Sequence, residues 1–217
     1  MPKSDSQLKK DVESELEWDA SVKANHIGVA VKDGVVTLSG HLDSFAEKYA
    51  AERAAQRVQG VKGLAVELDV RLGAAAKRTD AELAAAAESA LRWHALVPED
   101  RVKVMVEKGW VTLSGEVDWD YQRKYATKAV RPLTGIVGVT NSVVVRPQVT
   151  PADIHQRIQG ALERQADREA RNIEVIVSGH TATLRGKVHS WAERSAAQGA
   201  AWSAPGISSV VNELHVV

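Results

Sequence analysis

Apolar residues along this chain recur with two periods. At the start they occupy every fourth position, as in Leu8, Val12 and Leu16, and this spacing predicts a helix with one buried stripe. From residue 27 to 42 they alternate with polar residues on both sides of a short turn at residues 33–34. Alternation around an Asp-Gly turn predicts a β-hairpin with one buried face.

Two further segments complete the pattern. An alanine-rich helical stretch covers residues 46–55, and a third alternating stretch covers residues 64–70. Small side chains on one helix face allow the helix axis to approach a sheet closely. One-sided alternation in every strand means that helices cover only one side of the sheet. The first part of the chain is therefore predicted to fold as α-β-β-α-β.

The same order of patterns occurs three times. The hairpin reads VKDGVVTLSG at 31–40, VEKGWVTLSG at 106–115 and VSGHTATLRG at 177–186. An interval of roughly 70 residues exceeds the period of solenoid repeats, so it indicates whole duplicated domains. We predict an α+β fold of three tandem α-β-β-α-β domains, each a three-stranded sheet with two helices on one face. These domains, called repeats one, two and three below, are placed at residues 1–73, 78–147 and 149–217.

Polar residues and glycines recur at the element boundaries. Three pairs fit or approximate capping boxes at the start of the first helices: Ser4 with Gln7, Thr79 with Glu82, and Thr150 with Asp153. Eight glycines are predicted to have structural roles: Gly34 and Gly109 in hairpin turns, Gly40, Gly115 and Gly186 where a helix lies close over a strand, and Gly60, Gly135 and Gly206 as left-handed caps of the second helices.

The motif formed by these positions resembles the BON domain, a bacterial module named for osmotically induced and nodulation proteins. Its elements are an apolar first helix, G-x-V-T-L-S-G, a small-residue helix and G-V/I-x-x-V-x-N-x-V. Residues 109–115 and 135–145 match the motif, and the other two repeats match it more loosely, so the resemblance covers essentially the whole chain. It implies binding to phospholipid or membrane surfaces and protection under osmotic or envelope stress. The motif records glycines and core positions rather than catalytic groups.

Composition and charge narrow the function classes. Lys plus Arg and Asp plus Glu both total 28, so no net field attracts nucleic acid. The G-x-x-G stretches at 60–63 and 135–138 each join a helix to a strand, unlike the KH loop that joins two helices. We therefore expect no nucleic-acid partner. The first 18 residues are polar with no apolar run, which predicts neither a signal peptide nor a membrane anchor and favours a cytoplasmic location.

The sequence contains few residues in patterns that indicate catalysis. The chain has no Cys, G-x-S-x-G, Walker loop, dinucleotide G-x-G-x-x-G or H-E-x-x-H, so we predict no enzyme activity, catalytic residue or cofactor. Asp118 and Asp120 flank Trp119 and could form an acid and base pair, but their place before a helix favours capping. Of the seven histidines, only His180, His189 and His215 of repeat three form a group that could converge on a metal ion. Since their counterparts in the other repeats are not histidine, we expect exposed positions rather than a metal site.

Two surfaces are candidates for binding. The first combines basic and aromatic residues on the second helix of repeat two, and could rest on anionic phospholipid or be a solvated helix face: Trp119, Tyr121, Arg123, Lys124, Lys128 and Arg131. The second is the uncovered sheet face, which could pack against another repeat or a second chain, or form a groove for lipid or a partner: Met105, Trp110 and Val144 in repeat two, with Ile176 and Val211 in repeat three. We predict a membrane-peripheral lipid-binding protein, with a protein interaction scaffold as the alternative.

Overall fold

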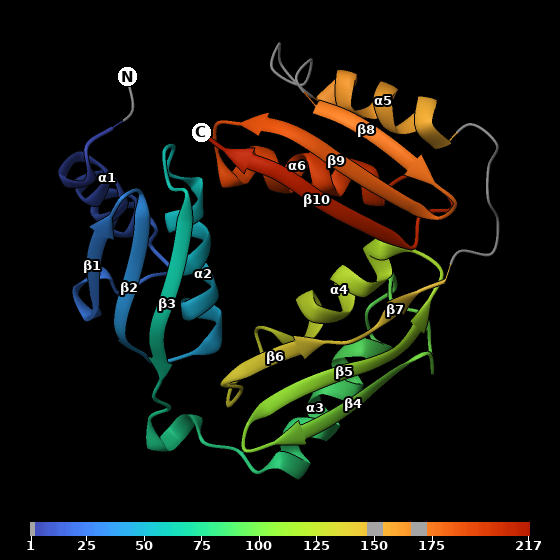
Figure 1. Cartoon of the computed structure of the whole chain (residues 1–217). Coiled ribbons are helices and arrows are strands. Elements are labelled where there is room, and N and C mark those ends of the chain that lie inside the picture. The colour runs from blue at the N-terminus through green and yellow to red at the C-terminus, as the bar shows by residue number, and fades with distance from the viewer. Residues whose placement is uncertain (1–2, 147–153, 166–172) are drawn as a thin grey trace. The chain divides into compact units, whose positions relative to one another are not determined.

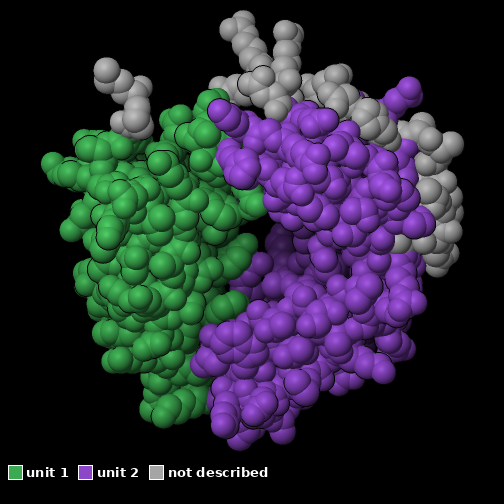
Figure 2. Space-filling model, in the orientation of Figure 1, with its two compact units in different colours: residues 1–77, 188–194, 216–217 green, residues 78–187, 195–215 purple. Residues whose placement is uncertain are grey.

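The computed structural model describes residues 3–146, 154–165 and 173–217, and Figure 1 shows their helices and strands. The chain divides into two compact units, residues 1–77 with 188–194 and 216–217, and residues 78–187 with 195–215 (Figure 2). We describe each repeat by itself. The predicted limits at residues 147 and 149 lie outside the described residues, so the domain boundaries stay predictions.

Repeat one contains a mixed three-stranded sheet. Its elements are α1 (Asp5–Trp18), η1 (Ala24–His26), β1 (Ile27–Lys32), β2 (Val35–Leu42), α2 (Phe45–Arg57) and β3 (Gly63–Val70), followed by η2 (Ala74–Ala76). The central strand β2 is antiparallel to β1 and parallel to β3. Parallel neighbours need a crossover connection, and α2 provides it. Figure 1 shows α1 and α2 on one side of this sheet.

Repeats two and three follow the same order. Repeat two contains α3 (Asp80–Arg92), β4 (Val102–Glu107), β5 (Trp110–Val117), α4 (Asp120–Val130), β6 (Gly138–Asn141) and β7 (Val144–Val145). Repeat three contains α5 (Ile154–Gln165), β8 (Ile173–Ser178), β9 (Thr181–Val188), α6 (Trp191–Trp202) and β10 (Ser209–Val216). The predicted α+β fold of three tandem domains is confirmed.

The helical stripes lie in the cores as predicted. Leu8, Val12 and Leu16 of α1 are buried in one cluster with the alanines of α2 and the inner residues of the sheet. The corresponding residues of α3 are also buried: Leu83, Ala87 and Leu91. In α5, Ile154 and Ile158 are buried, and the side chain of Leu162 lies outside the described part. Because the stripe repeats, the first helix has the same rotation about its axis in each repeat.

Capping hydrogen bonds are present at the N-termini of α1 and α3. Ser4 Oγ accepts a hydrogen bond of 3.2 Å from the Gln7 amide. Thr79 and Glu82 form a reciprocal box, because Glu82 accepts from the Thr79 amide at 2.8 Å and Thr79 Oγ1 accepts from the Glu82 amide at 3.2 Å. The third predicted pair, at residues 150 and 153, lies outside the described residues.

A carboxylate joins each of these first helices to the hairpin turn. Asp80 accepts hydrogen bonds from the Lys108 and Gly109 amides at 2.8 and 2.9 Å, and Asp5 binds the turn of repeat one in the same way. Repeat three has a different turn, in which His180 Nδ1 lies 2.7 Å from the Gly206 carbonyl oxygen. The first two repeats therefore share a contact between the first helix and the hairpin turn.

The structural reason why glycine is required inside these strands differs from the prediction. At Gly115, where φ is +126°, an added Cβ would lie 2.0 Å from the Arg101 carbonyl oxygen, and at Gly40, with φ +135°, it would lie 2.1 Å from that of His26. These oxygens precede the neighbouring strand, so close approach by a helix is not the cause. Gly186 has a similar φ of +137°. The prediction of a tightly packed helix is corrected to a positive-φ kink against the adjacent strand.

Two further predictions need correction. The second helices end at Arg57, Val130 and Trp202, at least three residues before Gly60, Gly135 and Gly206. These three glycines have positive φ values of 96°, 103° and 91°, but they lie in the turn before the third strand rather than at the helix caps.

The third strand of repeat two is also interrupted between β6 and β7. Asn141 Nδ2 donates hydrogen bonds of 2.7 Å to the Arg123 carbonyl oxygen and to Thr127 Oγ1, while Asn141 Oδ1 accepts from the Val143 amide at 3.0 Å. The two bonds from Nδ2 attach the end of β6 to α4, while the Ser142 amide still donates to the Leu113 carbonyl oxygen of β5 at 2.8 Å.

Candidate functional site

The predicted lipid-binding residues all belong to α4 or its immediate ends, but they differ in exposure. Trp119 and Tyr121 are exposed at the start of the helix. Lys124 and Lys128 are exposed one turn apart, whereas Arg123 and Arg131 are half-buried. Four of the six residues, two aromatic and two lysine, are therefore exposed, and the two arginines are only partly accessible to solvent.

A buried carboxylate lies under this group. Asp120 is only 3% exposed, and its two oxygens contact Arg123 and the Nζ of Lys124, the latter at 2.7 Å. A buried carboxylate needs such partners because desolvation of an unpaired charge is costly. Its position in the first turn also complements the helix dipole. Part of the positive charge predicted for this face is therefore neutralised within the helix.

The start of α4 differs from the prediction. The N-cap residue is Trp119, whose side chain makes no capping hydrogen bond, so the prediction that Asp118 or Asp120 acts as the cap is wrong. Gln122 Oε1 instead accepts from the Asp118 and Trp119 amides, both at 3.0 Å. The carboxylate of Asp118 receives hydrogen bonds from Arg101 at 2.6 and 3.2 Å. Neither aspartate forms an acid and base pair with the other.

Aromatic rings continue from α4 to the end of α3. The rings of Tyr121 and Tyr125 are 6.5 Å apart at their centroids in an edge-to-face arrangement, and Tyr125 lies 5.0 Å from the His94 ring. Lys128 Nζ lies 5.3 Å from the Tyr125 centroid, within range of a cation–π interaction. Trp93 directly precedes His94 and is 87% exposed. We call Trp93, His94, Tyr121, Lys124, Tyr125 and Lys128 the aromatic–basic surface.

The sequence-based prediction missed the α3 part of this surface. Trp93 is visible in the sequence because it matches Trp18 of repeat one, which is 84% exposed at the end of α1. A tryptophan at the end of a helix gives no sequence signal that tells exposure from burial. The contact of His94 with Tyr125 depends on the packing of α3 against α4, so no local pattern could have indicated it.

The open sheet face of repeat two carries a fixed indole. Trp110 is 47% exposed and its Nε1 donates a hydrogen bond of 2.8 Å to Thr140 Oγ1. A Cβ added at Gly138 would lie 2.4 Å from the Trp110 ring, so the ring rests directly on the glycine backbone. Met105 is 60% exposed and pairs with Thr112, two residues from Trp110 on the same strand face. These two apolar side chains are therefore close neighbours.

The other interface candidates are more scattered. Val144 is exposed but pairs with Glu116, six residues along β5 from Trp110, so it does not join the same patch. In repeat three, Ile176 and Val211 are exposed, and Ile176 pairs with Thr183. Among the predicted interface residues of repeat two, Met105 and Trp110 therefore lie together, and Val144 lies apart from them.

The described residues contain no group of three or more His, Asp or Glu side chains arranged to hold a metal ion. His180 is engaged near Gly206 in a hairpin turn, and His189 precedes α6. No helix in the described ranges is both long and apolar enough to cross a lipid bilayer.

A family model described as the BON domain matches residues 4–71, 79–147 and 150–217. Osmotically-inducible protein Y of Escherichia coli (strain K12) is 31% identical over 143 residues, which make up 64% of this chain and 71% of that protein.

Two solved structures of CdsD, a structural protein of the type III secretion system of Chlamydia trachomatis, also match at 15% identity. One has a TM-score of 0.26 and covers 97% of this chain and 92% of its own. The other, a C-terminal domain, has a TM-score of 0.27 and covers 99% and 100%.

Proposed function

Because the chain belongs to the BON-domain family, with three BON domains in tandem, we propose that it is a non-catalytic protein that binds phospholipid membranes during osmotic or envelope stress. The name of its relative, osmotically-inducible protein Y, supports the stress role. The aromatic–basic surface supports the membrane role. The single observation that carries the proposal is the series of ring contacts linking Tyr121, Tyr125 and His94 beside the exposed Trp93.

The composition of this surface fits the interfacial region of a bilayer. Trp and Tyr concentrate at membrane interfaces because their rings are apolar and their edges are polar. Lysines reach past such rings toward lipid phosphates, and each basic residue near an anionic surface contributes about 1 kcal/mol. Since Asp120 offsets part of the charge on Arg123 and Lys124, we assign a large share of the binding to the aromatic side chains.

Sedimentation with vesicles tests the proposal. Vesicles of phosphatidylglycerol should bind the protein at low salt, and phosphatidylcholine vesicles should bind it more weakly. Replacing Lys124, Lys128 and Arg131 together by Ser should lower binding to the anionic vesicles and reduce its salt dependence. Absence of binding at low salt, or equal binding by the triple variant, would remove the lipid function. Far-ultraviolet circular dichroism of the variant serves as the folding control.

The patch around Trp110 favours a second candidate function, a scaffold for protein interaction. An indole fixed by Gly138 and Thr140 loses little conformational freedom when a partner covers it, which favours a role in an interface. Light scattering of the wild type and of Trp110→Ser separates the two candidates. A scaffold loses self-association in the variant, whereas a lipid-binding protein shows no change in mass.

A further inference from the structure

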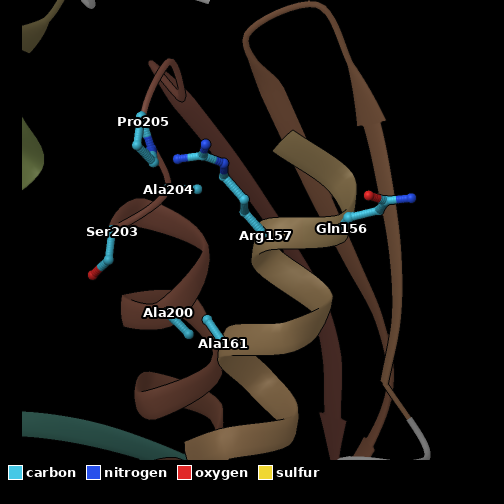
Figure 3. Close-up of a pocket in the computed structure, with 7 residues that line it drawn as sticks. All are labelled: Gln156, Arg157, Ala161, Ala200, Ser203, Ala204 and Pro205. Atoms are coloured by element: carbon cyan, nitrogen blue, oxygen red, sulfur yellow. The ribbon is translucent and has the colours of Figure 1, made fainter. Parts of the chain in front are cut away.

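The repeats differ where short and long side chains occupy matching positions. In repeat three, a groove lined in part by Ala161 and Ser203 lies between α5 and α6 (Figure 3). Glu15 and Arg57 form an ion pair at these positions in repeat one. In repeat two the long side chain is the addition, because Trp110 lies on the open sheet face. All strands around Trp110 are described, whereas several side chains of α5 lie outside the described part of the chain.

The Trp110 indole lies flat on its own sheet. A Cβ added at Gly138, which pairs with Trp110 on β6, would lie 2.4 Å from the ring atoms Cε3 and Cζ3 and 2.7 Å from Cδ2. Similar distances to three adjacent ring atoms place this Cβ over a face of the ring rather than at its edge. Because a Cβ points out of a pleated sheet, one face of the indole covers Gly138 and the other faces away from the strands.

Two contacts hold the ring in this orientation. The backbone of Gly138 supports one end of the indole, and Nε1 donates its 2.8 Å hydrogen bond to Thr140 Oγ1 two residues further along β6. The side chain is nevertheless exposed. Repeats one and three have Val35 and Thr181 at this position, so the aromatic ring belongs to repeat two alone. An exposed ring that is already immobilised loses little conformational entropy when a ligand stacks on it. We call Trp110, Gly138 and Thr140 the indole platform.

Polar side chains surround the indole platform. Glu107 is exposed and pairs with Trp110 across β4 and β5, and Thr112 pairs with Thr140 across β5 and β6. Paired residues project from the same face of a sheet, so a carboxylate and two hydroxyl groups border the ring. The carboxylate repels phosphate and other anions. Since the core of a protein interface is depleted of charge, this border favours a neutral ligand that has one apolar face and many hydroxyl groups.

We propose that the indole platform binds a saccharide by stacking one face of a pyranose ring on Trp110. Axial C–H groups make that face of a gluco-configured ring apolar, and the negative face of the indole attracts them. The equatorial hydroxyls project from the rim of the sugar, where Glu107 accepts hydrogen bonds and Thr112 accepts or donates them. Trp110 is not part of the aromatic–basic surface, so this function goes beyond membrane binding. A protein partner of a scaffold would compete for the same indole face.

Titration of the full-length, ¹⁵N-labelled protein with cellobiose tests the site. The indole N–H signal of Trp110 and the amide signals of Thr112 and Thr140 should shift saturably. The dissociation constant should be in the millimolar range, because one stacked ring and a few hydrogen bonds supply little binding energy. Sorbitol carries hydroxyls without a rigid apolar face and should bind about tenfold more weakly. Adenosine monophosphate should also bind about tenfold more weakly, since Glu107 repels its phosphate.

Two variants separate the presence of the ring from its orientation. Trp110→Val gives repeat two the residue of repeat one and should abolish cellobiose binding. Gly138→Ala keeps the indole but displaces it, because the new Cβ and the ring overlap, and should weaken cellobiose binding about tenfold. Val35→Ser changes the matching position of repeat one and should leave binding unchanged. Far-ultraviolet circular dichroism checks that each variant is folded.

The proposal is overturned if cellobiose gives no saturable shift of the Trp110 indole signal, if sorbitol binds equally well, or if Trp110→Val binds cellobiose like the wild type. Tighter binding of adenosine monophosphate than of cellobiose would also overturn it and assign the indole platform to nucleotides. Trp93→Ser, which changes the aromatic–basic surface, should leave cellobiose binding unchanged. Failure of the membrane function and failure of the saccharide site are therefore distinguished.

Discussion

Repeats one and two have the same skeleton and different surfaces. Both join the first helix to the hairpin turn through an aspartate, Asp5 or Asp80, and both end that helix in an exposed tryptophan. Their second helices diverge, because Tyr121 and Tyr125 of α4 correspond to Ala46 and Ala50 of α2. Duplication has therefore kept the groups that hold each domain together and changed those that face solvent. If this division is correct, substitutions of matching structural residues should lower the stability of both repeats alike. Substitutions of matching surface residues should change vesicle binding in only one of them.

The largest effect is expected at the strand glycines. Gly115→Ala should destabilise repeat two by about 3 kcal/mol, because the new Cβ meets the Arg101 carbonyl oxygen and φ is positive. Gly40→Ala should cost repeat one a similar amount. Urea unfolding measures both, with Gly199→Ala as the control, since no atom within 4 Å opposes a Cβ there. A loss of stability at only one of the two strand positions would contradict the view that both repeats share the same structural residues.

The helix-to-turn contact comes next. Asp80→Ala removes the acceptor for two backbone amides, those of Lys108 and Gly109, and should lower the free energy of unfolding by about 2 kcal/mol. Asp5→Ala should behave alike. Asp69→Ala provides a control on an exposed strand position, where the nearest ion-pair partner lies 4.0 Å away. Equal urea midpoints for Asp80→Ala and the wild type would show that water replaces the carboxylate without cost.

The two exposed tryptophans sharpen the surface comparison. Trp93→Ser should weaken binding to phosphatidylglycerol vesicles about tenfold, as expected for the loss of one large apolar side chain from the bilayer interface. Trp18→Ser, an equally exposed substitution in repeat one, should change binding less than about twofold, because Ala46 and Ala50 of α2 stand at the positions of Tyr121 and Tyr125. Vesicle sedimentation measures both. Equal losses in the two variants would assign the binding to the helix ends rather than to the aromatic–basic surface.

The smallest effect concerns acid stability. Hydrogen bonds from Ser21 and then from Arg57 hold the pKa of Asp19 below its usual value. A carboxylate with a lowered folded pKa stabilises the protein above its unfolded pKa, and this contribution is lost as the pH falls through the folded pKa. Arg57→Gln should therefore reduce the loss of stability below about pH 4. The change should be at most about 0.5 kcal/mol, because the pair is partly solvated, and urea unfolding at several pH values measures it.

Some features of the candidate site could be predicted from the sequence and others could not. The basic and aromatic residues of α4 were predicted because helical spacing alone places Lys124 and Lys128 on one face. The neutralisation of Lys124 by Asp120 was missed, since a capping role looked sufficient for an aspartate at a helix start. His94 was missed because its ring neighbour Tyr125 lies on another helix, and Trp93 was missed because a tryptophan at a helix end gives no sequence signal of its exposure. The groove lined by Ala161 and Ser203 was also missed, because the short side chains that leave the space open form no recognisable sequence motif.

By itself, the sequence determined the number of repeats, the order of elements and the buried stripes, since period and turn chemistry act between residues close along the chain. Only the tertiary structure decided which exposed side chains meet, why Gly40 and Gly115 must lack a Cβ, and where a space opens between helices. Those outcomes depend on distances between segments far apart in the chain. Such distances result from packing all the elements together, which no local pattern encodes.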